Sequence, residues 1–131
     1  MPNPILSVPV GFNYNSGSPI WAVQNKISVA HGDIDTIQWN LTCTGLPTGT
    51  TGRFAMTNPI NFVVRKGNNV GAAWTGPGPT RVNDTQVSVD DDNRGPSNGT
   101  QDYYYSVNLE LVTGGVAVGY TYDPEVENVG T

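Results

Sequence analysis

Four aspartates surround one loop in the second half of the chain, and carboxylates are the side chains that hold Ca²⁺ in proteins. They are Asp90, Asp91, Asp92 and Asp102. Ca²⁺ takes about six to eight oxygen ligands, which several carboxylates on one loop can supply. The spacing departs from the EF-hand pattern, because a loop counted from Asp90 has Arg94 at its fifth position and Gln101 at its twelfth. Two interpretations stay open, a calcium-assisted site and a solvated acidic turn, and the second requires fewer assumptions.

The chain has one histidine, His31, and one cysteine, Cys43, which limits the metal and nucleophile chemistry that it can support. A blue-copper site needs two histidines and a cysteine, so a single histidine excludes it. The single histidine also excludes a zinc site with two histidine ligands. One cysteine also excludes an internal disulfide. A cysteine-dependent enzyme built on Cys43 and His31 is a remote alternative, because the flanking residues match no cysteine-enzyme motif. We expect Cys43 to be a small buried hydrophobe and the chain not to be an enzyme.

Exposed aromatic rings are a second kind of candidate site, for a sugar or a proline-rich ligand. Trp74 is followed by a run of Thr, Gly and Pro that ends at Pro79, so its ring could be displayed on a loop. Trp21 follows the turn-forming residues 16–19 and is a candidate for the same reason. The alternative for Trp74 is a ring that closes one end of the fold. Trp39 lies in an alternating segment and is expected in the core.

Three consecutive tyrosines form the other aromatic candidate. Tyr103, Tyr104 and Tyr105 cannot all face the core, because successive side chains of a strand point to opposite faces. We expect Tyr104 to point outward, with Tyr120 or Tyr122 as its cross-strand partner. Such an aromatic pair would stiffen the sheet or form part of an interface, and Tyr104 is therefore a candidate ligand-binding residue.

The composition argues against several classes of partner. The 131 residues carry a net charge of -5 with six Lys and Arg, so binding to nucleic acid through phosphate neutralisation is not expected. No apolar run reaches the roughly 18 residues of a membrane span. The N-terminus has neither a basic segment nor a long apolar one, so no signal peptide is predicted. A cytoplasmic location is the expectation, with the compartment otherwise unknown.

The elements that must position these residues are predicted to be short strands. In the first half they cover residues 5–12, 20–30, 36–42, 53–56 and 60–66. Ile37, Trp39 and Leu41 alternate with polar residues, which is typical of a half-buried strand. Pro9 has no N–H to donate to a ladder, so it indicates an edge strand or a bulge. The Gly and Asn residues of 67–69 predict a hairpin turn.

The second half repeats this pattern. Strands are predicted over residues 70–74, 82–89, 103–112 and 116–122, with a rigid Gly-Pro corner over 76–79 and a turn at Gly114 and Gly115. These elements fit one domain over residues 1–131. A domain of this size can bury a stable core without disulfides or structural metal ions. The predicted fold is all-β, an antiparallel β-sandwich of about seven to nine strands, immunoglobulin-like or jelly-roll-like, with a closed barrel as the runner-up.

The two C-terminal strands also carry a family resemblance. Residues 103–112 read Y-Y-Y-S-V-N-L-E-L-V, and residues 119–126 read G-Y-T-Y-D-P-E-V after a short Gly turn. This order resembles the close of the AidA/PixA family of bacterial inclusion-body proteins, and residues 32–39 are similar to that family's G-D-x-[IV]-x-W strand with two additional residues. The resemblance implies a bacterial, non-enzymatic β-sandwich of poorly defined function and supplies no catalytic residues.

The leading functional hypothesis is therefore a non-enzymatic β-sandwich that acts by self-association, as a homo-oligomer, or by binding a protein partner along exposed edges. The alternative is a lectin-like or calcium-assisted module that binds a carbohydrate or another ligand. No cofactor is expected apart from the possible calcium ion.

Overall fold

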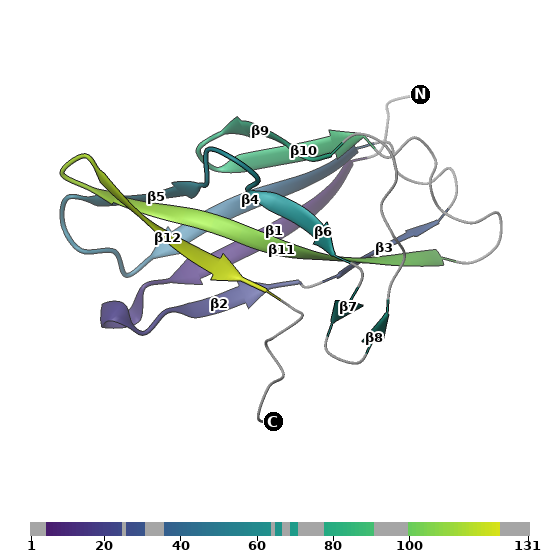
Figure 1. The fold of residues 1–131 in the computed structure, drawn as a ribbon, viewed down its shortest axis with the longest axis horizontal. Helices are drawn as coiled ribbons and strands as arrows, with labels where there is room; N and C mark the ends of the chain where they lie inside the picture. Colours follow the sequence, from purple (N-terminus) through teal and green to yellow (C-terminus); the bar gives the residue numbers. More distant parts are fainter. Residues whose placement is uncertain are drawn as a thin grey trace.

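Alternating apolar residues give each strand one hydrophobic face, and in a computed structural model of the chain two sheets pack these faces against each other (Figure 1). The structure describes residues 5–24, 26–30, 36–63, 65–66, 69–70, 78–90 and 100–123. The fold is all-β, and its two sheets are not closed into a barrel. The prediction of a β-sandwich is confirmed.

The first sheet has five strands in the order β2-β1-β4-β10-β9. The two central strands, β1 and β4, run parallel along the whole of β1, whereas the other neighbours are antiparallel. A short 3₁₀ turn, η1 (Asn15–Gly17), joins β1 to β2. The bounds are β1 (Ile5–Asn13), β2 (Ile20–Val23), β4 (Thr36–Thr44), β9 (Thr80–Asn83) and β10 (Gln86–Asp90).

The second sheet is organised around one long strand, β11 (Thr100–Thr113). β5 and β6 lie along one side of β11, and β12 and β3 lie along the other. A separate two-stranded hairpin, β7–β8, agrees with the turn predicted over 67–69. The bounds are β3 (Lys26–Ala30), β5 (Thr50–Phe54), β6 (Ile60–Val63), β7 (Arg65–Lys66), β8 (Asn69–Val70) and β12 (Val116–Tyr122).

The segment 20–30 was expected to be a single strand, and the structure divides it between the two sheets. β2 pairs with β1 in the first sheet, and β3 pairs with β11 in the second. The chain therefore crosses the sandwich after Val23. The Tyr105 hydroxyl donates a hydrogen bond to the backbone carbonyl of Gln24 at this crossing. Residue-by-residue alternation is the same in both halves of the segment, so the sequence pattern does not reveal the change of sheet.

The segment 82–89 is also two strands rather than one. β9 ends at Asn83 and β10 begins at Gln86, with a tight turn between them. The Asn83 side-chain oxygen accepts a hydrogen bond from the Thr85 backbone N–H at 2.9 Å, which is the local bond by which Asn favours turns. With these two divisions, and with Val70 of the segment 70–74 lying in the separate β7–β8 hairpin, the two sheets hold ten strands in the described chain instead of the predicted seven to nine.

Pro9 was expected in an edge strand or a bulge, but its strand β1 lies between β2 and β4. β1 pairs with β4 along its whole length, but its pairing with β2 begins only at Val10. Among the described residues, one side of β1 is thus without a partner strand at Pro9, where a missing N–H is tolerated. Of the segment predicted over 70–74, only Val70 lies within the described residues.

The core lies between the inward faces of the two sheets. Ile37, Trp39 and Leu41 from β4 are buried, as their alternation predicts. Opposite them, β11 buries Tyr105, Val107, Leu109 and Leu111 on one face. The Trp39 and Tyr105 rings meet edge to face with centroids 5.5 Å apart, a favoured geometry for an aromatic pair.

Replacing Tyr105 with Phe removes the hydroxyl that ties β11 to the crossing at Gln24 while keeping the ring in the core. We expect the free energy of unfolding to fall by about 1 kcal/mol, since a partly buried hydrogen bond is lost. Chemical denaturation measures this change. Tyr104→Phe is the matched control, because the Tyr104 hydroxyl makes no hydrogen bond in the described part of the chain, and an equal loss in both variants would contradict the assignment.

Candidate functional site

The predicted calcium ligands lie at two separate places as far as the structure describes them. Asp90 ends β10 in the first sheet, whereas Asp102 lies near the start of β11 in the second. Asp91 and Asp92 fall outside the described residues. Within the described ranges no three His, Cys, Asp or Glu side chains group together as a metal site would require. The calcium site stays a prediction that depends on the residues beyond Asp90.

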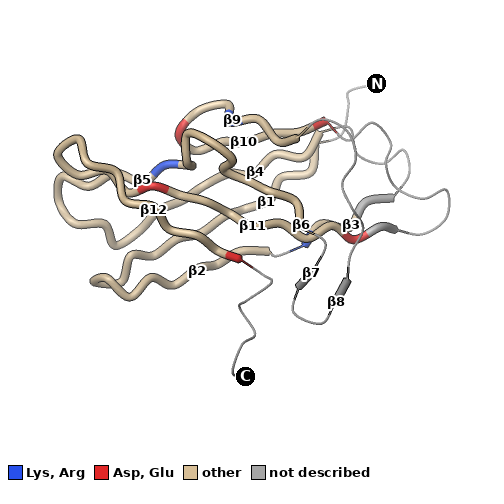
Figure 2. The backbone as a smooth tube through the Cα atoms, viewed as in Figure 1, with Lys and Arg blue, Asp and Glu red and all other residues tan. Residues whose placement is uncertain are grey.

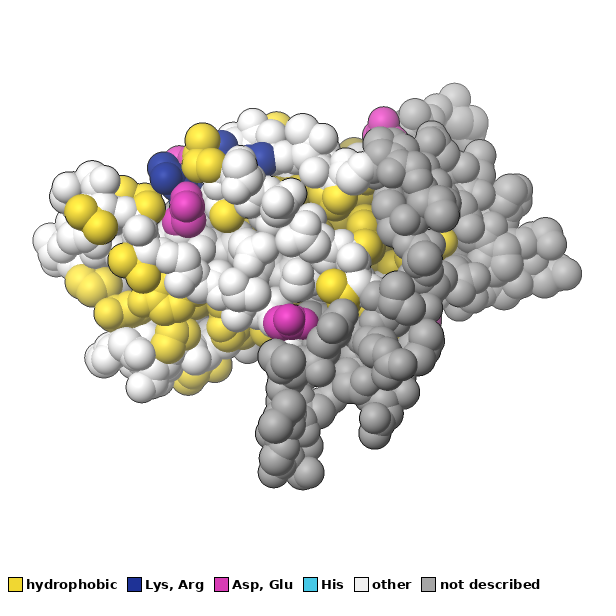
Figure 3. Space-filling view, viewed as in Figure 1, with side chains coloured by type: hydrophobic (Ala, Val, Ile, Leu, Met, Phe, Trp, Pro, Cys, Tyr) yellow, Lys and Arg dark blue, Asp and Glu magenta, His cyan; other side chains and the backbone are white. Residues whose placement is uncertain are grey.

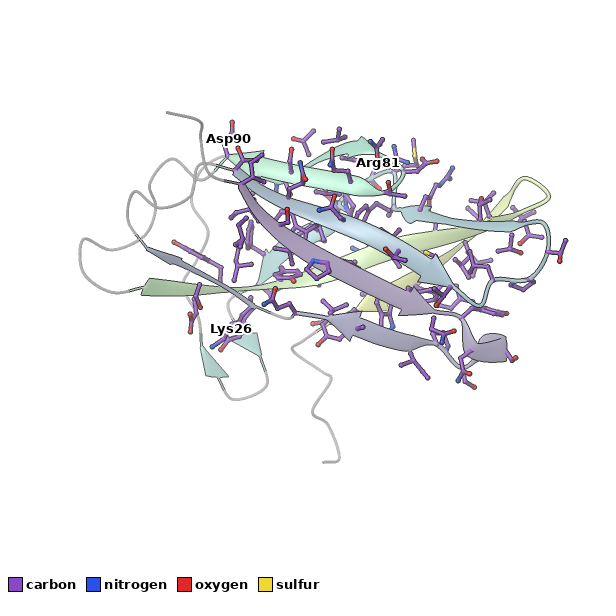
Figure 4. All side chains as sticks on the ribbon, turned by 180° about the vertical axis from the view of Figure 1, so that it is seen from behind. Lys26, Arg81 and Asp90 are labelled. Carbon is purple, nitrogen blue, oxygen red and sulfur yellow. The ribbon has the colours of Figure 1, made fainter. Side chains whose placement is uncertain are left out.

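Asp102 is held by two neighbours on β3. The Ser28 hydroxyl donates to Asp102 Oδ1 at 2.5 Å, and Lys26 Nζ approaches Asp102 Oδ2 at 3.4 Å. The Ser28 hydrogen bond, with Lys26 adding to it, lowers the pKa of the Asp102 carboxyl below its ordinary value. Figure 4 shows Lys26, the partner of Asp102, well apart from Asp90. Asp102 thus serves the β3–β11 pairing in this structure.

The three aromatic candidates have different outcomes. Trp74 lies outside the described residues. Tyr104 points away from the core face occupied by Tyr103 and Tyr105, as predicted, but only 7% of its surface is exposed. Its cross-strand neighbours are Lys26 on β3 and Val63 on β6, so Tyr104 lies between two paired strands, and its role in ligand binding stays a prediction.

The partner predicted for Tyr104 is wrong. Tyr122 lies opposite Val107, and Tyr120 lies opposite Leu109, so both tyrosines belong to the core face of the sheet. The pairing of β11 with β12 begins at Val107, three positions after Tyr104. The register of the last hairpin determines which residues of β12 lie opposite each residue of β11. This register follows from the tight turn at Gly114 and Gly115, both of which have positive φ.

Trp21 leads to a surface that the sequence did not single out. Its ring is half-buried and packs against Phe12 at 4.9 Å and against Tyr122 at 5.8 Å. These contacts join β2 to β12, the edge strands of the two sheets on this side of the sandwich. We call this side the open seam, and its residues are Tyr14, Trp21, Leu111, Val116, Val118, Tyr120 and Tyr122.

The opposite side of the sandwich is closed by polar bonds. The Phe54 backbone N–H in β5 donates to the carbonyl of Asp84 at 2.7 Å, which links the second sheet to the β9–β10 turn of the first. Arg81 donates from Nε to the Phe54 carbonyl at 3.3 Å and pairs with Asp84. Charged positions therefore gather around β5 and β9, whereas β12 carries none along its length (Figure 2).

The open seam leaves apolar side chains of β12 uncovered. Val118 lies opposite Leu111 and Val116 opposite Thr113, so both valines are on the face that buries the core further along β11. Nevertheless, Val118 is 52% exposed and Val116 is 64% exposed. Hydrophobic side chains gather at this side of the molecule, between β12 and β2 (Figure 3). Within the described residues, the first sheet does not extend far enough to cover this end of β12.

A hollow of about 310 Å³ lies at the end of the open seam. Two tyrosine rings, a proline, two aliphatic side chains and three threonines line it, and Thr50 and Thr113 are hydrogen-bonded to each other at 2.7 Å. None of the lining residues carries a charge. They are Tyr14, Pro47, Thr48, Thr50, Leu111, Thr113, Val118 and Tyr120. This chemistry suits a neutral ligand with both apolar and hydroxyl groups.

A second hollow of about 460 Å³ lies where the chain crosses between the sheets. Leu6, Val23 and Ile27 form its apolar part, and Gln24, Lys26 and Ser28 complete its lining. Lys26 and Ser28 are engaged with Asp102. These two side chains therefore serve the pairing of β3 with β11.

Cys43 is half-buried on β4, and burial raises the pKa of its thiol. The neutral thiol is a poor nucleophile, which agrees with the expectation of a structural cysteine. His31, its proposed catalytic partner, lies outside the described residues. The cysteine-dependent enzyme therefore gains no support from the geometry around Cys43.

One feature of the sequence indicates the open seam, although the alternation of side chains does not reveal it. No charged residue occurs from Leu111 to Tyr122, although this segment contains a whole edge strand. Natural edge strands commonly carry a Lys, a Pro or a bulge that discourages pairing with another chain. β12 carries neither a Lys nor a Pro, and this absence indicates an edge strand that can pair with another chain.

Removing the Ser28 hydroxyl should raise the pKa of Asp102 toward its ordinary value near 3.8. Because the folded-state pKa is lowered, Asp102 stabilises the fold above its unfolded-state pKa, and this contribution is lost as the pH falls through the folded-state pKa. Ser28→Ala should therefore weaken the fold above pH 4 and flatten its acid dependence below it. Carboxyl ¹³C NMR titration measures the shift, and Thr36→Val, in the first sheet, should leave the Asp102 titration unchanged.

No family model, curated protein or solved structure matches this chain. The resemblance of its two C-terminal strands to the AidA/PixA family stays a prediction. In the described part of the chain, no helix has the length and apolar character needed to cross a bilayer.

Proposed function

We propose that this chain is a non-enzymatic β-sandwich domain that acts by association, pairing another polypeptide strand with the free edge of β12 beside the open seam. The observation that carries the proposal is the combination found in β12. Among the described strands it is a seven-residue edge strand without charge, and Val116 and Val118 are more than half exposed although they lie on the core face. Adding a strand to such an edge satisfies backbone groups and buries apolar side chains together.

The edges of β9, β2 and β5 are protected by contrast. β9 and β2 have four residues each, and β9 carries Arg81 beside a register shift in its pairing with β10. The edge of β5 donates its Phe54 N–H to the β9–β10 turn. Short length, charge and irregular pairing are the devices that discourage strand addition. The described charged side chains near these elements act structurally, since Glu110 pairs with Arg53 at 3.0 Å and Asp84 pairs with Arg81.

Val118→Lys places a charge on the exposed core face of β12 and should abolish association, because an inward-pointing charge on an edge strand opposes strand pairing. Val82→Lys is the matched control, since Val82 is 53% exposed on β9. Light scattering over a concentration series and binding to an immobilised peptide of residues 115–123 are the two measurements. A wild-type chain that stays monomeric and does not bind this peptide would contradict the proposed function.

A lectin-like function is the second candidate, favoured by the uncharged hollow between Tyr14 and Tyr120. A sugar could stack on a tyrosine ring and bond to the threonine hydroxyls. Tyr14→Ala should weaken binding of neutral oligosaccharides about tenfold by removing one ring. NMR titration measures this, with Val82→Ala as the remote control, and no binding to the wild-type chain at millimolar sugar would exclude this candidate.

A further inference from the structure

The partner that best fits the free edge of β12 is β12 of a second copy of this chain. We propose that two copies pair these strands antiparallel about a twofold axis at Gly119, a symmetry in which the same patch serves both copies. This inference rests on the proposed function and adds to it the identity of the partner and the register. Three independent features of β12 support it: its backbone groups, its side chains and its charge.

The backbone groups that β12 offers can be identified from β11. Asn108 directs both its backbone groups toward the β5–β6 side, because its N–H donates to Pro59 at 2.7 Å and its carbonyl accepts from Ala55 at 2.9 Å. The next residue, Leu109, therefore directs its groups to Tyr120, its partner in β12. It follows that Gly119 directs its N–H and carbonyl to the free edge. By the same alternation Ala117 and Thr121 do so as well.

These three residues can pair with the same three residues of a second copy. In the register centred on Gly119, Gly119 faces its own counterpart, and Ala117 faces Thr121 of the partner subunit. Each of these pairs exchanges two backbone hydrogen bonds in an antiparallel ladder. This register uses all seven residues of β12, whereas a twofold axis at any other residue leaves some of them unpaired.

The side chains on the core face are complementary in this register. Val118 lies opposite Tyr120 of the partner subunit, and Val116 lies opposite Tyr122 of the partner subunit. Aromatic and β-branched residues form favourable cross-strand pairs. The pairing also covers the two valines that the open seam leaves exposed. Gly119 places no side chain at the axis, so the two strands can approach closely there.

Charge favours this edge over other approaches between two copies. Each chain carries a net charge of -5, so two copies repel each other over most of their surfaces. The segment from Leu111 to Tyr122 has no charged residue. Glu110, the nearest carboxylate on β11, is paired with Arg53. The paired strands would form one continuous sheet in the order β11-β12-β12-β11 across the two copies.

Disulfide cross-linking in a Cys43→Ala background tests the register. A side chain at Gly119 fits, because among the described residues a Cβ there meets the Leu109 carbonyl oxygen alone, at an ordinary contact distance of 3.9 Å. In the proposed register the two Gly119 Cα atoms are about 5.5 Å apart, within the range of a disulfide. Gly119→Cys should therefore give a covalent dimer with oxidised glutathione. Ala117→Cys is the matched control, because four residues of offset separate its two copies by about 13 Å.

A mixture of the Ala117→Cys and Thr121→Cys chains should cross-link to each other, since these positions face each other in the register. Covalent dimers formed equally well by Ala117→Cys alone would overturn the inference. If Gly119→Cys gives no dimer while Val118→Lys still abolishes association, the register is wrong and the proposed function stands. If the wild-type chain is monomeric but binds the peptide of residues 115–123, the second-copy partner is excluded.

Discussion

The contact between Trp39 and Tyr105 is the interaction on which both sheets depend. Trp39 lies in the middle of β4, between β1 and β10, and Tyr105 lies on β11, to which every other strand of the second sheet pairs. Both side chains are fully buried. The Trp39 indole N–H has no acceptor among the described residues, which costs about 1–3 kcal/mol. The packing of two large rings offsets this cost, since each buries far more apolar surface than an aliphatic residue.

This central contact leaves the two sides of the sandwich to be closed by different means. On the β5 side, backbone and guanidinium donors bind the Asp84 and Phe54 carbonyls. On the β12 side ring contacts join the two sheets, with Phe12 against Tyr120 at 5.4 Å and Trp21 against Tyr122. Ring contacts constrain the relative position of the two sheets less than hydrogen bonds do, so they tolerate a gap at the end of the open seam. The hollow beside Tyr14 is that gap.

Local alternation predicted those parts of the structure that are decided within one strand. It placed Trp39 in the core, identified which face of β11 is buried, and located the final hairpin through Gly114 and Gly115. It did not predict that residues 20–30 belong to two sheets, that β1 runs parallel to β4, or that Tyr104 is covered by neighbours on both sides. Each of these depends on which strands pair across long separations, and the period-two pattern is identical for every such pairing. The open seam was missed for the same reason.

The exposure of Val116 and Val118 follows from the difference in length between facing edge strands. β12 has seven residues, whereas β2, the edge strand that faces it, has four. The hairpin turn at Gly114 and Gly115 extends β12 beyond the end of β2, so Val116 and Val118 have no described strand of the first sheet packed over them, and Val118 instead lines the hollow beside Tyr14. Covering each valine would contribute about 1 kcal/mol. Because the described strands cannot reach this end of β12, that stabilisation is available to a partner strand, and a charge-free edge presents no electrostatic obstacle to it.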